Sequence, residues 1–397
     1  MVQNHTIIIQ TKNRLKWLDY SLNLYSEYKC KSKIVVIDGS DEETYLKNSE
    51  LISSLKEKLS LEHIRESTSF SEIHKNKNLS IFNYIKNFLN TPYFSHVPDD
   101  DMFFPNFTNT AIDFLEKNKE FSAITGVEIN LFWDKNYNIY KNLTKVYSEF
   151  LQDDPLDRVL HYATDQNRTL PGMGVVRSSI MKDLVNLEKE LKFKPFCREN
   201  IKGLYCYEQE MTFTLFYLIQ GKIKVDKKNL MNFRNRHLDA TRQTNLISND
   251  EHFDLFDPAT LLLNDTFKDF LKEHLTELLF FIKNKTAYET KTVERVFKKV
   301  IWTFITSLVS SDLHDNKTKY SFNLKEYRGN FKKLTVSIPN VKKIFTGDRI
   351  MLIKDFILQL KHKFLRYFIT VRINILTEKE RKKFINLSNK IFKQTNK

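Results

Sequence analysis

The sequence predicts an α/β fold, with a Rossmann-like, mostly parallel sheet flanked by helices and a mainly helical C-terminal unit. Over the first 100 residues, short β-branched runs alternate with longer amphipathic stretches, which is typical of parallel strands joined by crossover helices. Polar residues follow three of these runs. Six of the eight glycines precede residue 250, and long amphipathic stretches dominate after it.

Hydrophobic periodicity places the first elements. Strands are expected at 6–9, 33–37, 61–65 and 93–97. Helices are expected over 15–28, 42–59 and 70–89. The fourth strand leads directly into three consecutive acidic residues, Asp99, Asp100 and Asp101.

Later segments are less regular. A helix over 208–220 is expected to end at Gly221, a residue favoured just past a helix end, and a strand over 222–225 follows. Mixed strand and loop is expected over 120–140 and a turn-rich segment over 164–177. We expect the boundary between Asn245 and Asp257, which gives a catalytic domain (1–245) and a helical, basic domain (250–397).

Composition limits the classes of function. The formal charge of +14 suits a nucleic acid, an anionic membrane surface or a phosphorylated substrate. No apolar run approaches the ~20 residues of a spanning helix. Three cysteines without CxxC spacing and an N-terminus without a signal-peptide pattern favour a reducing, cytoplasmic location.

The strand ends are where a ligand is expected, because open α/β sheets bind ligands outside the carboxyl ends of their strands. Thr11 and Asn13 follow the first strand, Asp38 ends the second, and the acidic triplet follows the fourth. Three adjacent carboxylates repel one another unless a cation neutralises them. Their oxygen ligands favour Mg²⁺ or Mn²⁺ over softer metals.

Four segments, in this order and spacing, resemble GT-A glycosyltransferases of the broad family-2-like type, found in bacterial surface-polysaccharide (capsule and O-antigen) synthesis. The segments are Ile7–Arg14, Val35–Asp41, Asp99–Asp101 and Tyr207–Thr212. The resemblance covers about the first 240 residues. Gln10, Lys12 and Ile37 depart from the family pattern.

The resemblance implies a metal-dependent enzyme that moves a sugar from a nucleoside-diphosphate sugar, with a UDP-type donor favoured, to a glycan or lipid-linked acceptor. Thr11, Asn13 and Arg14 would border the nucleotide, and Asp38 would contact its base or ribose. The triplet resembles the DxD element, so Asp101 would bind Mn²⁺ or Mg²⁺. Asp99 would contact the ribose or the metal, and Asp100 would lie beside the donor.

The fourth segment is similar to the family's Glu-Asp element, whose acidic residue lies about 11 positions before a glycine. Counting back from Gly221 gives Glu210 as the general base of an inverting transfer, with Glu208 as second choice. An exposed acidic first turn, favoured by the helix dipole, is the alternative interpretation of both.

Other expected contacts also come from the resemblance. His237 would close over the metal and the diphosphate, and Arg234 and Arg236 would pair with phosphate oxygens, in a segment expected to follow the last strand of the sheet. Lys77 and Asn78 are candidates to lie near the diphosphate. Gly172 is a candidate for the wall between the donor and acceptor pockets. For Gly172 a plain turn is the alternative.

The C-terminal stretch 354–397 is strongly basic and amphipathic, with 12 Lys or Arg against 3 acidic residues. It would serve as core, as a surface for a homo-oligomer, or as a peripheral contact with the inner face of the cell membrane.

Two other classes of function compete with glycosyl transfer. A nucleic-acid-binding protein would use the basic tail, but strand-end carboxylates oppose a polyanion, so no nucleic acid is expected. A sugar nucleotidylyltransferase would want a glycine-rich loop after the first strand, and Gln10–Arg14 is no such loop.

Overall fold

A computed structural model describes residues 4–66, 87–133, 139–164, 171–183 and 214–237, together with 282, 288–289 and 291–293. Over these residues the chain is an α/β protein with a central sheet flanked by helices, as predicted.

The first elements follow the predicted order, with ends that differ by a few residues. They are β1 (His5–Thr11), α1 (Leu15–Glu27), β2 (Lys33–Asp38), α2 (Glu42–Leu55), β3 (Leu61–Arg65) and β4 (Tyr93–Pro98). The expected helix 70–89 lies outside the described residues except for 87–89, where a turn begins instead.

The later elements are more extended than predicted. They are β5 (Met102–Phe103), α5 (Pro105–Lys117), β6 (Phe121–Trp133), β7 (Ile139–Lys145), α6 (Pro155–Thr164), the 3-10 turn η2 (Pro171–Met173), β8 (Val175–Arg177) and β9 (Lys222–His237). Residues 214–220 are helical, and the rest of the expected helix 208–220 lies outside the described part.

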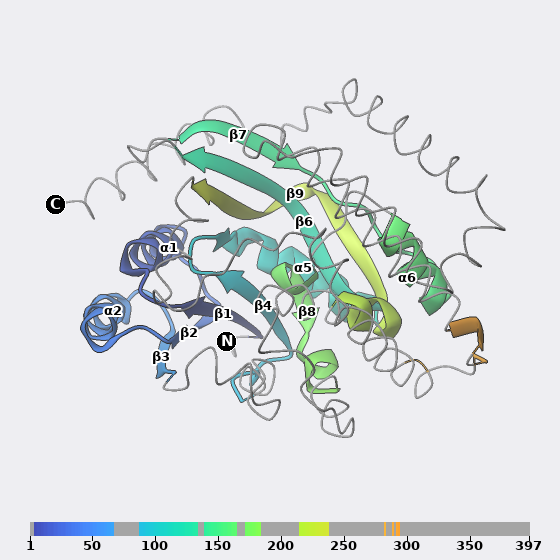
Figure 1. Ribbon diagram of the computed structural model, residues 1–397, viewed down its shortest axis with the longest axis horizontal. Coiled ribbons are helices and arrows are strands. Elements are labelled where there is room, and N and C mark those ends of the chain that lie inside the picture. The colour runs from blue at the N-terminus through green and yellow to red at the C-terminus, as the bar shows by residue number, and fades with distance from the viewer. Residues whose placement is uncertain are drawn as a thin grey trace, which may run out of the picture.

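The sheet runs in the order β3-β2-β1-β4-β8-β6-β9-β5, with β7 paired to β6 (Figure 1). β2, β1 and β4 are parallel neighbours, and β6 regains their direction because β8 pairs antiparallel with both β4 and β6. β9 then runs parallel to β6. Six strands therefore share one direction, while β5, β7 and β8 oppose it.

β9 corrects the prediction of a short strand over 222–225. Near Asp226 the pairing with β6 shifts register, because the backbone N–H groups of Lys228 and Asn229 turn back to the Asp226 carboxylate. The strand then resumes and follows β6 to His237. Residues 234–237 were expected after the last strand, but they form its end.

Both faces of the sheet are buried, which explains why its strands read as continuous apolar runs. Ile7 and Ile9 join the cluster under α1 and α2, which also holds Trp17 and Ile52. Ile8 faces the opposite cluster with residues of α6 and of helix 214–220. In Figure 1, α1 and α2 lie beside the end of the sheet formed by β1, β2 and β3.

Little of the expected C-terminal domain is described. Ile282 and Val293 belong to the same buried cluster as Phe150 and Phe216. The boundary between 245 and 257 lies outside the described residues, so the domain division stays a prediction. Within the described part, no helix combines the length and apolarity needed to cross a bilayer.

Candidate active site at the carboxyl ends of the strands

The predicted strand ends meet at one edge of the sheet. Thr11 is in register with Asp38 on β2, and Gln10 is in register with Pro98 on β4. The acidic triplet begins directly after β4 and therefore lies next to the end of β1. Sequence reasoning placed these groups together, and the parallel register explains why.

Asp99 is held by Thr11, the last residue of β1, and by Arg14, which follows that strand. Thr11 Oγ1 donates to Asp99 Oδ2 at 2.8 Å, and Arg14 Nη1 lies 2.7 Å from Asp99 Oδ1. The other end of the same guanidinium lies 2.7 Å from Asp100 Oδ2. Burial, together with Asp100, raises the pKa of Asp99, against the opposing attraction of Arg14.

The turn that carries the triplet is fixed through its backbone. Asp101 N–H donates to Pro98 O at 3.1 Å. The buried hydroxyl of Ser21, on α1, lies within hydrogen-bonding distance of the carbonyl oxygens of Asp99 (2.7 Å) and Asp101 (3.2 Å). Packing of α1 against the turn thus fixes the backbone from which both carboxylates project.

Asp101 points to β9 rather than to β1. Asn235 N–H donates to Asp101 Oδ1 at 2.9 Å, and Arg234 Nε donates to Oδ2 at 3.1 Å. The antiparallel pairing of β5 with β9 brings these residues together, with Met102 opposite Phe233. The side-chain amide of Asn235 also donates to the Asp100 carbonyl.

A fourth carboxylate, Glu128 on β6, joins this cluster. It is 1% exposed, and it accepts hydrogen bonds from Tyr147 (2.7 Å) and Asn130 (2.9 Å). Arg234 Nη1 lies 3.7 Å from its Oε2. Sequence reasoning missed Glu128, although an acidic residue inside an apolar strand was the signal that could have found it.

The loops after β1 and β2 are bonded to each other. Asn13 has a left-handed φ of 55°, and its backbone N–H donates to Ser40 Oγ at 2.8 Å. Its side-chain oxygen accepts from the N–H of Asp41, which caps α2. Gly39 N–H donates to Thr11 O. Both loops are therefore held in place before any ligand arrives.

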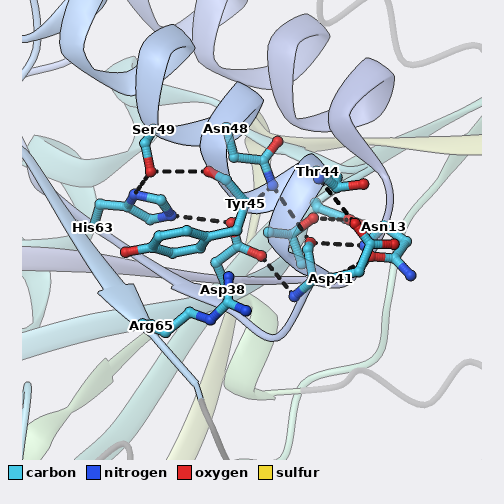
Figure 2. A network of polar contacts seen from close by, with 12 residues as sticks. Asn13, Asp38, Asp41, Thr44, Tyr45, Asn48, Ser49, His63 and Arg65 are labelled. Carbon is cyan, nitrogen blue, oxygen red and sulfur yellow. Dashed lines mark hydrogen bonds and ion pairs between the residues drawn. The ribbon is translucent and has the colours of Figure 1, made fainter.

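Asp38 is the fully buried centre of a second network (Figure 2). Ser40 N–H donates to Oδ1 at 2.9 Å. Oδ2 accepts from Asn48 Nδ2 (2.8 Å) and lies 3.0 Å from His63 Nε2. Although burial opposes it, hydrogen bonds from His63, Ser40 and Asn48 hold the pKa of Asp38 below its usual range.

His63 is enclosed by aromatic and polar neighbours. Its ring stacks on Tyr45 with centroids 4.7 Å apart, and Ser49 Oγ lies 3.2 Å from Nδ1. The guanidinium of Arg65 lies 4.1 Å from the Tyr45 ring centroid, so Tyr45 contacts both side chains (Figure 2). His63 and Asn48 were not predicted as site residues. They come from β3 and α2, away from the strand-end turns.

Among the described side chains, this cluster holds more acidic than basic groups. Four carboxylates, those of the triplet and of Glu128, face the guanidiniums of Arg14 and Arg234. Full ionisation of these six groups would leave two negative charges. In the described part of the chain, no three His, Cys, Asp or Glu side chains are placed to hold a metal ion by themselves.

This donor set nevertheless fits an ion of the Mg²⁺ type. Such an ion commonly takes one or two carboxylates, with substrate phosphates and water as its other ligands. Each carboxylate offers about four lone-pair positions, so a hydrogen bond to each oxygen of Asp101 still leaves room for a cation.

Several predicted site residues remain untested. Glu208, Glu210, Lys77 and Asn78 lie outside the described residues. Arg236 and His237 end β9, but their side chains are not described.

Gly172 is buried in η2. Because β8 pairs antiparallel with β4, the chain before β8 brings η2 towards the carboxyl end of β4. The structure therefore places Gly172 on the triplet side of the sheet, and its role as an acceptor wall stays a prediction.

No protein-family model and no curated protein matches the chain. Solved structures match it at low identity. S. aureus TarS 1-349, also solved in complex with UDP-GlcNAc, is 14% identical with a TM-score of 0.47, and the match covers 85% of this chain and 82% of that chain.

Two further structures are similar at lower TM-scores. Mannosyltransferase PcManGT from Pyrobaculum calidifontis, in complex with GDP-Man and Mn²⁺, is 10% identical with a TM-score of 0.37, covering 90% of this chain and 87% of that chain. A 4-diphosphocytidyl-2C-methyl-D-erythritol synthase from Anaerococcus prevotii is 12% identical with a TM-score of 0.31, covering 58% and 87%. Likeness at this level does not identify an activity.

Proposed function

We propose that the chain is a glycosyltransferase of the GT-A type, which moves a sugar from a nucleoside-diphosphate sugar to a hydroxyl group of a glycan or lipid-linked acceptor. The observation that carries the proposal is the arrangement of the sheet edge. Two loops that are bonded to each other lie beside an acidic turn with excess negative charge. The resemblance of the four sequence segments supports the same activity.

The loops after β1 and β2 would hold the nucleotide. Thr11 ends β1, Asn13 and Arg14 come from the loop after it, and Asp38 anchors the second loop. Because these loops are already hydrogen-bonded to each other, little conformational freedom would be lost when the nucleotide binds. A UDP-type donor is the favoured proposal.

The acidic turn would hold Mn²⁺ or Mg²⁺ through Asp101 and Asp99, with His237 as a further proposed ligand. A divalent ion held in this position would supply positive charge to the departing diphosphate. The observation in favour of a cation is that, among the described side chains, four carboxylates face two guanidiniums, an arrangement that would repel a diphosphate alone.

The chemical step would be an inverting displacement. The acceptor oxygen attacks the anomeric carbon, its proton passes to a carboxylate, and the bond from that carbon to the diphosphate breaks. Glu210 is the proposed base, with Glu208 as second choice. Both precede the described helix 214–220, which packs into the core beneath the sheet.

The acceptor side of the proposal rests on sequence alone. A glycan or lipid-linked acceptor of surface-polysaccharide synthesis would bring the enzyme to the inner face of the membrane. The basic stretch 354–397 is the proposed contact, through either the membrane or a second copy of the chain.

The test is sugar transfer and donor hydrolysis by the full chain with a panel of nucleotide-sugars, with Mn²⁺ and with EDTA. We expect activity with one nucleotide class. Asp101→Ala and Glu210→Ala should each lose at least a hundredfold of that activity. The control Asp157→Ala, which changes an exposed acid on α6, should lose no activity. Absence of turnover with every donor would refute glycosyl transfer. Full activity of Asp101→Ala would refute the metal assignment alone.

A further inference from the structure

A chain of charged groups links the acidic turn to the middle of the sheet. Asp101 accepts from Arg234 Nε at 3.1 Å, and Arg234 Nη1 lies 3.7 Å from Glu128 Oε2. Tyr147 donates to the same Glu128 oxygen at 2.7 Å. The members come from the turn after β4, from β9, from β6 and from the segment after β7.

Arg234 is enclosed between two carboxylates. Its side chain is 19% exposed, and those of Asp101 and Glu128 are 4% and 1% exposed. Although burial works to lower it, the neighbouring Asp101 and Glu128 raise the pKa of Arg234. One guanidinium between two carboxylates leaves a net negative charge, which is a poor receptor for a diphosphate.

Glu128 is in turn fixed from its other side. Asn130 donates to Oε1 and Tyr147 to Oε2, so both oxygens have partners besides Arg234. A buried carboxylate with these two hydrogen bonds keeps one orientation, and its charge attracts the guanidinium of Arg234, whose Nη1 lies 3.7 Å from Oε2. Fixing the guanidinium fixes the direction of the Asp101 carboxylate.

We propose that Arg234 and Glu128 are positioning residues that hold the Asp101 carboxylate towards the cation of the donor site, and that Arg234 does not bind the diphosphate itself. The inference rests on the proposed function, and it revises the phosphate contact that the sequence suggested for Arg234. Partners that orient a metal-binding side chain commonly contribute 10- to 100-fold to metal affinity.

The experiment measures Mn²⁺ binding by the full-length chain, from the electron paramagnetic resonance signal of the free ion. Glu128→Gln keeps the size of the side chain and removes its charge. Arg234→Lys keeps the charge but cannot bridge both carboxylates. We expect each variant to weaken Mn²⁺ binding by about tenfold or more.

A matched control separates positioning from simple loss of charge. Glu149→Gln makes the same change in a partly buried glutamate that pairs with Lys224, another cation of β9, at 2.6 Å. We expect this control to bind Mn²⁺ like the wild type. Wild-type affinity in Arg234→Lys would overturn the positioning role, and so would an equal loss in Glu149→Gln.

Nucleotide binding in EDTA tests the second half of the proposal, with UDP and GDP as probes in calorimetry. If Arg234 bound the diphosphate through its forked guanidinium, Arg234→Lys would weaken UDP and GDP binding without metal. We expect unchanged nucleotide affinity in this variant, because it keeps the net charge of the cluster. A loss of several-fold would overturn the inference.

The two failures are distinguishable. If the wild-type chain transfers sugar but its variants bind Mn²⁺ with unchanged affinity, the inference fails and the proposed function stands. A wild-type chain that binds no Mn²⁺ also overturns the inference, while glycosyl transfer is still judged by product formation.

Discussion

Acid should destabilise the fold through His5, the buried first residue of β1. Ser95 Oγ donates to Gly174 O at 2.6 Å, so it can only accept from His5 Nε2, 3.0 Å away. Nδ1 therefore has no proton and accepts from Ser32 Oγ at 2.9 Å. The imidazole is neutral, with both nitrogens used, and an added proton at Nδ1 would end the bond that Ser32 donates and bury a positive charge.

The size of the effect follows from the two protonation equilibria. Burial lowers the pKa of His5 from 6.5 to about 3 in the folded chain. Between these values the unfolded chain binds more protons, so the free energy of unfolding falls as the pH falls from about 6.5 towards 3. At about pH 5 the expected loss from His5 alone is about 2 kcal/mol.

The assay compares urea denaturation of the wild type and of His5→Gln at about pH 7 and about pH 5. Glutamine offers one acceptor and two donors but does not titrate. We expect the wild type to lose about 2 kcal/mol more than the variant between the two pH values. His96, whose burial lowers its pKa to about 4, is present in both proteins and cancels. The same pH dependence in both proteins would refute the buried neutral histidine.

Two further predictions concern the turns of the site. Asn13→Ala should cost about 1 kcal/mol more than Asn13→Gly in urea denaturation, because both lose the side-chain bond but only alanine is strained at a φ of 55°. Equal costs would contradict a left-handed Asn13. Ser21→Ala should cost about 1–3 kcal/mol and weaken nucleotide binding, because the carbonyls of Asp99 and Asp101 lose a buried donor. The exposed hydroxyl of Ser54 gives the control, and Ser54→Ala should change stability by less than about 0.5 kcal/mol.

The part of the fold that could be predicted is the part set by local pattern. Ile7–Ile9 and Ile34–Ile37 are continuous apolar runs because both faces of the sheet are buried. Parallel strands place their carboxyl ends at one edge, so Thr11, Asp38 and the triplet could be grouped from sequence alone.

The partners of those residues could not be predicted, because they come from distant parts of the chain. Asp101 meets Arg234 only because β9 continues past its shift near Asp226 and pairs with β5. A strand over 222–225 leaves Arg234 beyond the sheet, which is why its segment was expected to follow the last strand. Asp38 likewise finds Asn48 on α2, a contact that requires knowing how the helix packs.

The charge argument for a cation survives in a changed form. From sequence, three adjacent carboxylates seemed to need a metal because nothing else neutralised them. In the structure Arg14 and Arg234 already pair with all three, which alone would leave one negative charge. Glu128 adds a second negative charge, because it shares the guanidinium of Arg234 with Asp101. The demand for a divalent ion therefore depends on a residue of β6, 27 positions away from Asp101 in sequence, and removing its charge should weaken that demand at the turn.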